Sequence, residues 1–316
     1  MEPGLVSVVL VTWNSAPFLR RCLEGIRQQT QRTELIVVDN GSTDDSVALI
    51  GDDATIIRNA DNRGFSAAVN QALRVARGDV VLLCNPDAYL EPDYAARLAA
   101  ALHDRFGMAT GKLLHAEGFD IRPTNIIDSK GIRMTRSGRH FDIDQGLPDD
   151  GRVDVEEVFG VSGAAAMYTR SFLDDVAVNG EVFDEDFHTY REDADLSWRG
   201  RLFGWRALYV PAAVGYHVRT VTPAKRRTLA PLVNMHSVKN RFLLRLKNES
   251  LRMALRHAPF EIPRDLVAIG AVLTIERTSL PALRWLWKNR RRVMAKRCDI
   301  QQRRRVSDRE LAKWFR

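Results

Sequence analysis

SVVLVTWN, residues 7–14, is the stretch that decides the fold. Its first six residues form a continuous run rich in β-branched side chains, which favours a strand buried on both faces of a sheet. Helical spacing and apolar runs then alternate along the chain. The predicted helices are 16–29, 66–76 and 92–106, and the further predicted strands are 35–38, 54–57 and 79–84. This alternation predicts an α/β fold with a mostly parallel sheet flanked by helices.

The pattern changes in the second part of the chain. Residues 118–154 are rich in Gly, Asp and Arg and predict hairpins and loops, whereas 184–203 runs from an acidic cluster into a helix. Residues 205–210 predict a strand. From Pro223 onward the composition is helical and basic.

The charge is divided between two regions of the chain. Residues 1–218 hold 22 Lys and Arg against 33 Asp and Glu, and 219–316 hold 25 against 7. Such segregation predicts two regions with different partners. Three cysteines without short spacing indicate neither a disulfide framework nor a zinc site and fit a reducing compartment. The start of the chain lacks a signal-peptide pattern, and no apolar run reaches the roughly 18 residues of a membrane span.

Polar residues follow each predicted strand of the first part. In an open parallel sheet ligands bind at the carboxyl ends of the strands, so four such loops predict one crevice. The alternative is that Asn, Asp and Gly simply make turns there. The four loops are Thr12-Trp13-Asn14, Asp39-Asn40-Gly41-Ser42, 59–64 and Asn85-Pro86-Asp87.

Phosphate binding in this crevice requires a group other than a glycine-rich loop. Neither a dinucleotide fingerprint nor a phosphate loop follows the first strand. A divalent cation held by Asp87 would neutralise a diphosphate, because Mg²⁺ and Mn²⁺ accept carboxylate and phosphate oxygens. The alternative is that Asp87 caps a turn. His217 is a candidate second ligand only if it lies near Asp87, and is otherwise structural.

The second acidic cluster is Glu192-Asp193-Ala194-Asp195. Carboxylates this close raise one another's pKa values, and a carboxylate near a helix start is stabilised by the helix dipole. Such a group can accept a proton from an attacking hydroxyl. The alternative for one of the three is helix capping.

These motifs together resemble family-2 inverting glycosyltransferases of the GT-A fold, in the rhamnosyltransferase-like branch. The resemblance covers roughly residues 5–247. The segments that carry it are 7–14, Val37 to Asp44, Asn62 to Asn70, Leu83 to Asp87 and Glu192-Asp193.

The resemblance implies a role for each candidate residue. Asp193 is the expected catalytic base, with Glu192 and Asp195 as acceptor-contacting or supporting residues. Asp87 and His217 are the expected ligands of a divalent cation, Mg²⁺ or Mn²⁺. The expected donor-binding residues are Thr12, Trp13, Asn14, Asp39, Asn62, Arg63, Gly64, Asn85 and Asp87. The first acidic position of the family's metal motif is Asn85 here, which makes a second ligand such as His217 more useful.

The resemblance also implies a reaction. A sugar, with L-rhamnose from dTDP-L-rhamnose as the first candidate, is transferred to a hydroxyl of a glycan or polyprenyl-diphosphate-linked acceptor in cell-surface polysaccharide synthesis. UDP- and GDP-sugars are alternative donors. From other classes, a nucleotidyltransferase or an inactive nucleotide-sugar-binding module remain alternatives, although the loop after the first strand lacks the basic residues of the former.

The sequence predicts a GT-A domain over 1–218, with a donor half at 1–115 and an acceptor half at 116–218, followed by a basic helical region at 219–316. Trp285, Trp287 and Trp314 lie among basic residues, so 284–316 is predicted to bind an anionic membrane surface. A solvated tail is the alternative, and nucleic acid is a weaker one. The expected location is cytoplasmic, peripheral at the inner face of the membrane, and the oligomeric state is left open.

Overall fold

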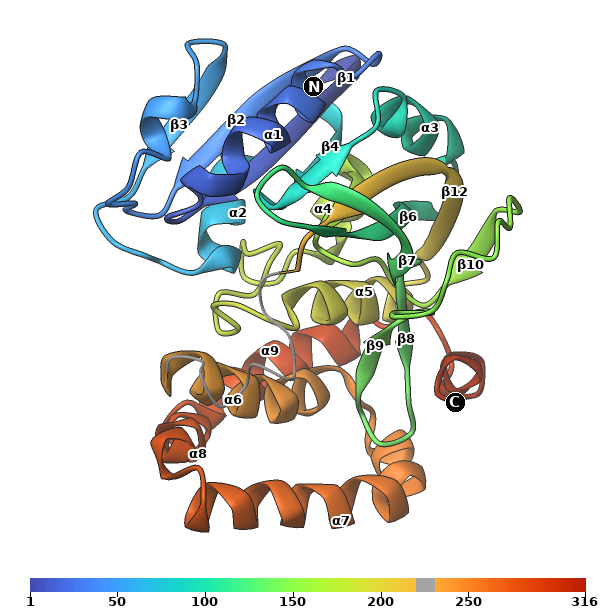
Figure 1. Cartoon of the computed structure of the whole chain (residues 1–316). Helices are drawn as coiled ribbons and strands as arrows, with labels where there is room; N and C mark the ends of the chain where they lie inside the picture. The colour runs from blue at the N-terminus through green and yellow to red at the C-terminus, as the bar shows by residue number, and fades with distance from the viewer. Residues whose placement is uncertain (220–230) are drawn as a thin grey trace.

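A computed structural model describes residues 1–219 and 231–316. Its centre is a mixed sheet (Figure 1) in the order β10-β12-β6-β11-β4-β1-β2-β3, with β5 beside β12 and β7 beside β6. The main strands are β1 (Glu2–Thr12), β2 (Thr33–Asp39), β3 (Ala54–Arg58), β4 (Gly78–Cys84), β5 (Ala88–Leu90), β6 (Phe106–Glu117), β7 (Arg122–Ser129), β10 (Glu156–Val158), β11 (Ala165–Thr169) and β12 (Arg206–His217). A separate hairpin pairs β8 (Ile132–Met134) with β9 (His140–Asp142).

The predicted parallel sheet is confirmed in its first half. β1 pairs in parallel with β2 and β4, and β2 with β3. β11 enters between β4 and β6 in the opposite direction, so β6 and β12 run parallel to the first four strands. Six strands therefore point the same way, and their carboxyl ends lie at one edge of the sheet.

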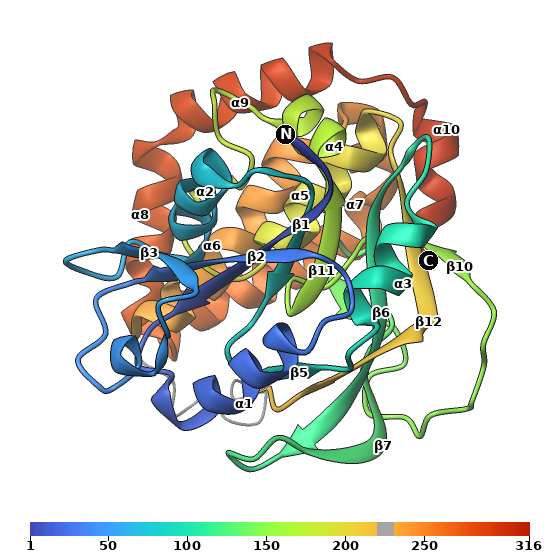
Figure 2. The same cartoon turned by 90° about the horizontal axis from the view of Figure 1, so that it is seen from above.

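Alternating side chains of β1 face two helical layers. Val8 and Leu10 belong to the core shared with α1 (Ala16–Arg27) and α3 (Tyr94–Ala101). Val9 belongs to the core shared with α2 (Phe65–Val75), α4 (Arg170–Val176) and α5 (Glu192–Leu202). Figure 2 shows the two layers on opposite sides of the strands. The period of two residues along a strand thus produces the three-layer architecture.

Two predicted boundaries are wrong. The helix predicted over 92–106 ends at Ala101, because a turn with Asp104 at φ 44° leads into β6, where pairing with β12 begins at Phe106. The strand predicted over 205–210 continues to His217. A register shift between Val210 and Val214 absorbs Pro211, which has no N–H to donate.

The basic region forms a helical layer against α5. Its elements are α6 (Pro231–Asn248), α7 (Leu251–Thr274), α8 (Leu280–Lys288), α9 (Arg290–Gln302) and α10 (Asp308–Leu311). Residues 223–230 of the predicted basic helix lie outside the described residues. Leu243, Ile300 and Phe315 belong to the same hydrophobic cluster as Trp198 of α5. Residues 231–316 and the sheet domain therefore share one core.

Candidate active site

The first part of the crevice lies where β1 and β2 end. Thr12 and Asp39 are paired in register, and the N–H of Asn40 donates to the carbonyl of Thr12 over 2.9 Å. Both side chains are buried. The Asp39 carboxylate accepts from the Ser42 N–H at 3.2 Å. Within the described part of the chain the Thr12 hydroxyl has no hydrogen-bond partner. A buried hydroxyl without a partner is what a polar ligand would satisfy.

Asn14 connects the loops after β1 and β2. Its backbone has φ 50°, its side-chain oxygen accepts from the Thr43 N–H at 2.8 Å, and its own N–H donates to the Ser42 hydroxyl at 2.9 Å. Trp13 beside it is 55% exposed. The loop therefore holds an indole ring in solvent next to the Thr12–Asp39 pair.

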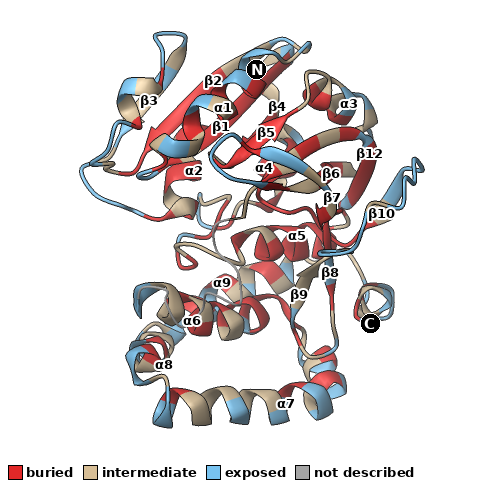
Figure 3. Cartoon of the chain, viewed as in Figure 1, coloured by how far each residue is buried: buried red, intermediate tan, exposed pale blue. Residues whose placement is uncertain are grey.

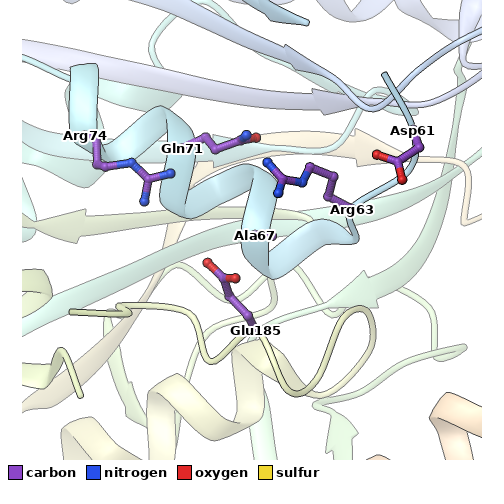
Figure 4. A pocket seen from close by; sticks show the side chains of 6 residues that line it. All are labelled: Asp61, Arg63, Ala67, Gln71, Arg74 and Glu185. Atoms are coloured by element: carbon purple, nitrogen blue, oxygen red, sulfur yellow. The ribbon is translucent and has the colours of Figure 1, made fainter. Parts of the chain in front are cut away.

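The segment Asn62-Arg63-Gly64 begins α2. Asn62 accepts from the Gly64 N–H at 2.9 Å, and Gly64 has φ 89° with the His188 ring so close that a Cβ would lie 2.4 Å from it. Arg63 lines a pocket along α2, with Glu185 facing the helix (Figure 4). None of Thr12, Asp39 and Asp87 lines that pocket. The segment itself lies beside the loop after β2, because the side-chain amide of Asn40 donates to the Gly64 carbonyl at 3.2 Å.

Asp87 and His217 lie together, as the metal prediction requires. Asp87 follows β4, His217 ends β12, and β5 pairs with β12 so that Ala88 faces His217. The Nε2 of His217 is 3.2 Å from Oδ1 of Asp87, and both residues are buried. Adjacent ligands around an octahedral cation are about 3 Å apart when each bond is roughly 2.1 Å. An imidazole and a carboxylate at this spacing fit Mg²⁺ or Mn²⁺.

Asp128 on β7 is a site residue that sequence reasoning missed. Its Oδ2 is 2.8 Å from Nδ1 of His217, and it is 2% exposed. Burial alone would lower the pKa of His217, but Asp87 and Asp128 on its two nitrogens raise it to about 10. A carboxylate behind a histidine fixes its ring and tautomer, which is the usual environment of a metal-ligating histidine. No local pattern in the sequence distinguishes Asp128, because only the β6–β7 pairing brings it to His217.

Arg219 connects this pair to the β8–β9 hairpin. Its guanidinium donates to Asp128 and to Asp142, each at 2.7 Å. His140 in the same hairpin lies 3.2 Å from Arg191, and burial and Arg191 lower the pKa of His140 to about 3. The hairpin within 118–154 therefore contributes to the site.

Asp193 occupies the first turn of α5. Its carboxylate accepts from the Gly163 N–H at 3.1 Å and the Ala194 N–H at 2.7 Å. Burial raises its pKa, partly opposed by these bonds. Burial and the Asp193 charge raise the pKa of Glu192 to about 8, and in the described residues Oε2 of Glu192 has no hydrogen-bond partner. The Glu192 carboxyl therefore holds its proton near pH 7, and the two backbone N–H bonds oppose the rise in the pKa of Asp193.

Asp195 and Asn85 take supporting positions. Asp195 is fully buried, and it pairs with Arg199 at 2.9 Å and Lys247 at 3.0 Å. The bond to Lys247 joins α5 to α6. Asn85 is half-buried, and its backbone N–H donates to the carbonyl of Ala164 at 2.8 Å. This bond places the Asp87 loop beside the Gly163 backbone that holds Asp193.

The loop before Asp193 is strained and held by α6. His188, Tyr190 and Arg191 have φ of 64°, 67° and 72°, conformations that cost non-glycine residues of the order of 1–3 kcal/mol each. The buried amide of Asn240 donates to the carbonyls of Phe187, Thr189 and Tyr190 within 2.9 Å. Asn240 was not predicted as a site residue, and only the docking of α6 reveals it.

One other group of potential metal ligands occurs in the described residues. Ligand atoms of Glu249, His257 and Glu261 lie within 4.8 Å of one another. Arg245 pairs with Glu261 at 2.9 Å, and His257 with Glu249 at 2.8 Å. The Arg245–Glu261 contact connects α6 to α7, so we assign the group to the packing of these two helices.

Comparisons with known proteins agree with this architecture. The family model described as "Glycosyl transferase family 2" matches residues 7–177. An L-rhamnosyltransferase of Mycobacterium tuberculosis, named for N-acetylglucosaminyl-diphospho-decaprenol, is 28% identical over 67% of this chain and 76% of its own length. The O-antigen chain rhamnosyltransferase RfbN of Salmonella typhimurium is 25% identical over 84% of this chain and 86% of its own. The putative glycosyltransferase EpsH of Bacillus subtilis is 30% identical, over only 33% of this chain and 32% of its own.

Solved structures share the fold. TarS of S. aureus in complex with UDP aligns with a TM-score of 0.56 at 18% identity, covering 85% of this chain and 75% of that one. A mannosyltransferase of Pyrobaculum calidifontis with GDP-Man and Mn²⁺ aligns with a TM-score of 0.53 at 18% identity, covering 93% and 84%. The GT-A fold predicted from the motifs is confirmed. The chain belongs to glycosyl transferase family 2, in its rhamnosyltransferase-like branch.

Proposed function

We propose that the protein transfers L-rhamnose from dTDP-L-rhamnose to a hydroxyl of a lipid-linked glycan during synthesis of a cell-surface polysaccharide. The sugar and the lipid-linked acceptor are taken from the two rhamnosyltransferase relatives, one of which is named for a decaprenol-linked substrate. The observation that carries the proposal is the carboxylate of Asp193, which two backbone N–H groups orient beside the loop of Asp87.

The proposed reaction is a single displacement. Asp193 accepts the proton of the acceptor hydroxyl, whose oxygen forms a bond to the anomeric carbon as the bond from that carbon to the diphosphate oxygen breaks. The Gly163 N–H and the α5 dipole keep the carboxylate aimed and ionised. Asp39 and Thr12 are proposed to hold the base and ribose.

A divalent cation is proposed to complete the donor site. Asp87 and His217 would hold it, and Asp128 and Arg219 keep His217 in place. Bound there, the cation would neutralise charge on the departing diphosphate. The binding of Mn²⁺ with a nucleotide sugar by the Pyrobaculum mannosyltransferase supports a cation of this class, and does not distinguish Mg²⁺ from Mn²⁺.

The base assignment is tested by Asp193→Asn, with Glu192→Gln as its matched control. The first change removes the proton acceptor, so we expect sugar transfer to fall at least about a thousandfold while calorimetry still detects donor binding. Glu192→Gln preserves the neutral form that dominates at pH 7 and should keep transfer within several-fold. Loss of donor binding in folded Asp193→Asn would remove Asp193 from the base role.

The donor is identified separately. A panel of dTDP-, UDP- and GDP-sugars with Mg²⁺ or Mn²⁺ is scored by thermal shift and nucleotide release. We expect dTDP-L-rhamnose to give the largest responses. A stronger response to a UDP- or GDP-sugar would retain the transferase and change the sugar, whereas pyrophosphate release from a nucleoside triphosphate would indicate a nucleotidyltransferase.

A further inference from the structure

α7 lies at one end of the molecule, beyond α6 and opposite the β1–β3 end of the sheet (Figure 1). Only Met253, His257, Glu261 and Val272 of its 24 residues are buried. Figure 3 shows the contrast with α5, which is buried almost throughout. In the described part of the chain no single helix is long and apolar enough to cross a membrane; α7 and the segment 277–288 meet that test only as a pair bent by 106°.

The exposed side of α7 carries a regular apolar stripe, which we call the α7 stripe. Its members are separated by four, seven, four and seven residues, a spacing that aligns side chains along one side of a helix. They are Leu251, Leu255, Ile262, Leu266 and Leu273, and they are 72%, 70%, 56%, 65% and 53% exposed.

This helix is amphipathic with its apolar side outward. At about 100° per residue, the buried positions 253 and 257 lie roughly opposite the centre of the stripe, and 261 and 272 lie about a quarter turn or more from it. Two of the four carry ionisable side chains, His257 and Glu261, while leucines face solvent. A helix normally buries its apolar side, so the α7 stripe indicates a surface that is covered by a partner.

Exposed basic residues lie on α7 itself and on the two helices that follow it in the chain. Arg252 and Arg256 are exposed on α7, and Arg284, Lys288, Arg290 and Arg291 are exposed on α8 and α9. Trp287 is 70% exposed, and the Arg290 guanidinium lies 4.4 Å from the centre of its ring. Residues 251–291 contain eight Lys and Arg against three Asp and Glu. Two of these acids, Glu261 and Asp265, are paired with Arg245.

We propose that the α7 stripe binds the surface of an anionic lipid bilayer, with α7 lying in the plane of the membrane. Leucines on one side of a helix and arginines beside them match the acyl boundary and the charged headgroups of such a surface. A second copy of the chain would bring the same positive charges into the contact, which disfavours a dimer through this face.

The proposal relocates the membrane surface predicted for 284–316. The later part of that segment is anchored on the protein: Ile300, Leu311 and Phe315 are buried, and Trp314 stacks on Arg201. α7 also contacts the β8–β9 hairpin, where Arg264 donates to Ser137 at 2.9 Å. The inference does not depend on which sugar is transferred.

The test compares two double variants of the full chain that change charge equally. Leu255→Glu with Leu266→Glu alters the stripe, and Leu147→Glu with Val153→Glu alters exposed apolar residues outside α7. All four side chains are exposed, so both variants should fold. Flotation is measured with phosphatidylcholine vesicles with and without phosphatidylglycerol, and oligomeric state by sedimentation velocity.

We expect the unaltered protein and the control variant to float with anionic vesicles, and the stripe variant to lose at least tenfold in binding. The proposal would be overturned if the unaltered protein did not float with anionic vesicles, or if both variants floated equally. The proposal would also be overturned if the unaltered protein were a dimer that did not bind vesicles, and the stripe variant were a monomer. Calorimetric donor binding should be equal in all three proteins, which separates this result from a failure of the proposed function.

Discussion

Glu192 and Asp193 are adjacent in the chain but have different surroundings. Asp193 accepts two backbone N–H bonds, whereas burial and the charge of Asp193 keep the proton on Glu192. The two carboxyls thus differ in their hydrogen-bond partners, and it is Asp193 that the proposed reaction uses as the base.

The raised pKa of Glu192 predicts how stability depends on pH. The folded protein holds this proton up to about pH 8, and an unfolded glutamate releases it near pH 4.3 or so. The folded state therefore binds more protons between these values, and stability falls as the pH rises through that window. Glu192→Gln should flatten the slope, measured by urea unfolding at pH 5 and pH 8. A slope equal to that of the unaltered protein, or of an exposed control such as Glu24→Gln, would contradict this.

We expect Asp128 to affect metal affinity through His217, without itself contacting the metal. Removing the carboxylate behind a ligating histidine costs about 10–100-fold in affinity, so Asp128→Asn should weaken Mn²⁺ binding by that factor, measured by calorimetry. His217→Ala and Asp87→Ala should weaken it further. Asp149→Asn, which loses an ion pair with Lys112, should not. Unchanged Mn²⁺ affinity in Asp128→Asn would exclude Asp128 from this role.

At the scale of elements, α6 determines the shape of the loop before Asp193. Asn240 holds three carbonyls of that loop, and Lys247 reaches Asp195 and Asp184 from the same helix. Lys296 of α9 pairs with Asp184 at 2.7 Å. Positive charge in the C-terminal region thus neutralises buried carboxylates around the base of α5. This accounts for part of the charge division along the sequence.

Asn240→Leu tests the link between α6 and catalysis. Without the amide, the carbonyls of Phe187, Thr189 and Tyr190 lose these bonds, so we expect the strained loop to relax and Asp193 to shift. A misplacement of about 1 Å can cost on the order of a hundredfold in rate, so we expect kcat to fall by roughly that factor with donor affinity retained. Gln301→Leu, which loses a single bond from α9 to Asn248, is the control and should keep kcat within a few-fold. Wild-type kcat in Asn240→Leu would rule out this positioning role.

At the scale of the whole molecule, the end of the chain completes the main core. Phe315 is 3% exposed, with ring centres 5.0 Å from Trp198, 5.2 Å from His257 and 5.9 Å from Phe159. The last residues therefore pack against α5 within the main hydrophobic cluster. We propose that 1–218, although predicted as a catalytic domain, does not fold as an independent unit.

Phe315→Ala predicts a large loss of stability. Truncating a fully buried phenylalanine costs about 3–5 kcal/mol, and urea unfolding should detect a decrease of that size. Trp287→Ala removes a larger ring from the same basic region, yet 70% of that residue is exposed and the change should stay within about 0.5 kcal/mol. Similar losses in both variants would mean that the end of the chain does not belong to the core.

The sequence by itself determined the elements of the first half, the polar strand ends and the family. Strand periodicity, turn residues and helix starts are local signals. Each can be recognised within a few residues, as in the segments 7–14, 37–44 and 83–87. For the same reason Asp87 and Asp193 could be named as candidates, and their roles stay predictions.

Only the tertiary structure decided which distant residues meet. The pairing of β5 with β12 brings His217 to Asp87, the pairing of β6 with β7 adds Asp128, and docked helices hold Asp193 and seal the core. The tertiary structure also decided that the α7 stripe faces outward. Periodicity identifies an apolar stripe on a helix but does not tell whether that stripe faces the core or the solvent. Contacts between residues far apart arise from packing of the whole chain, and no short segment contains that information.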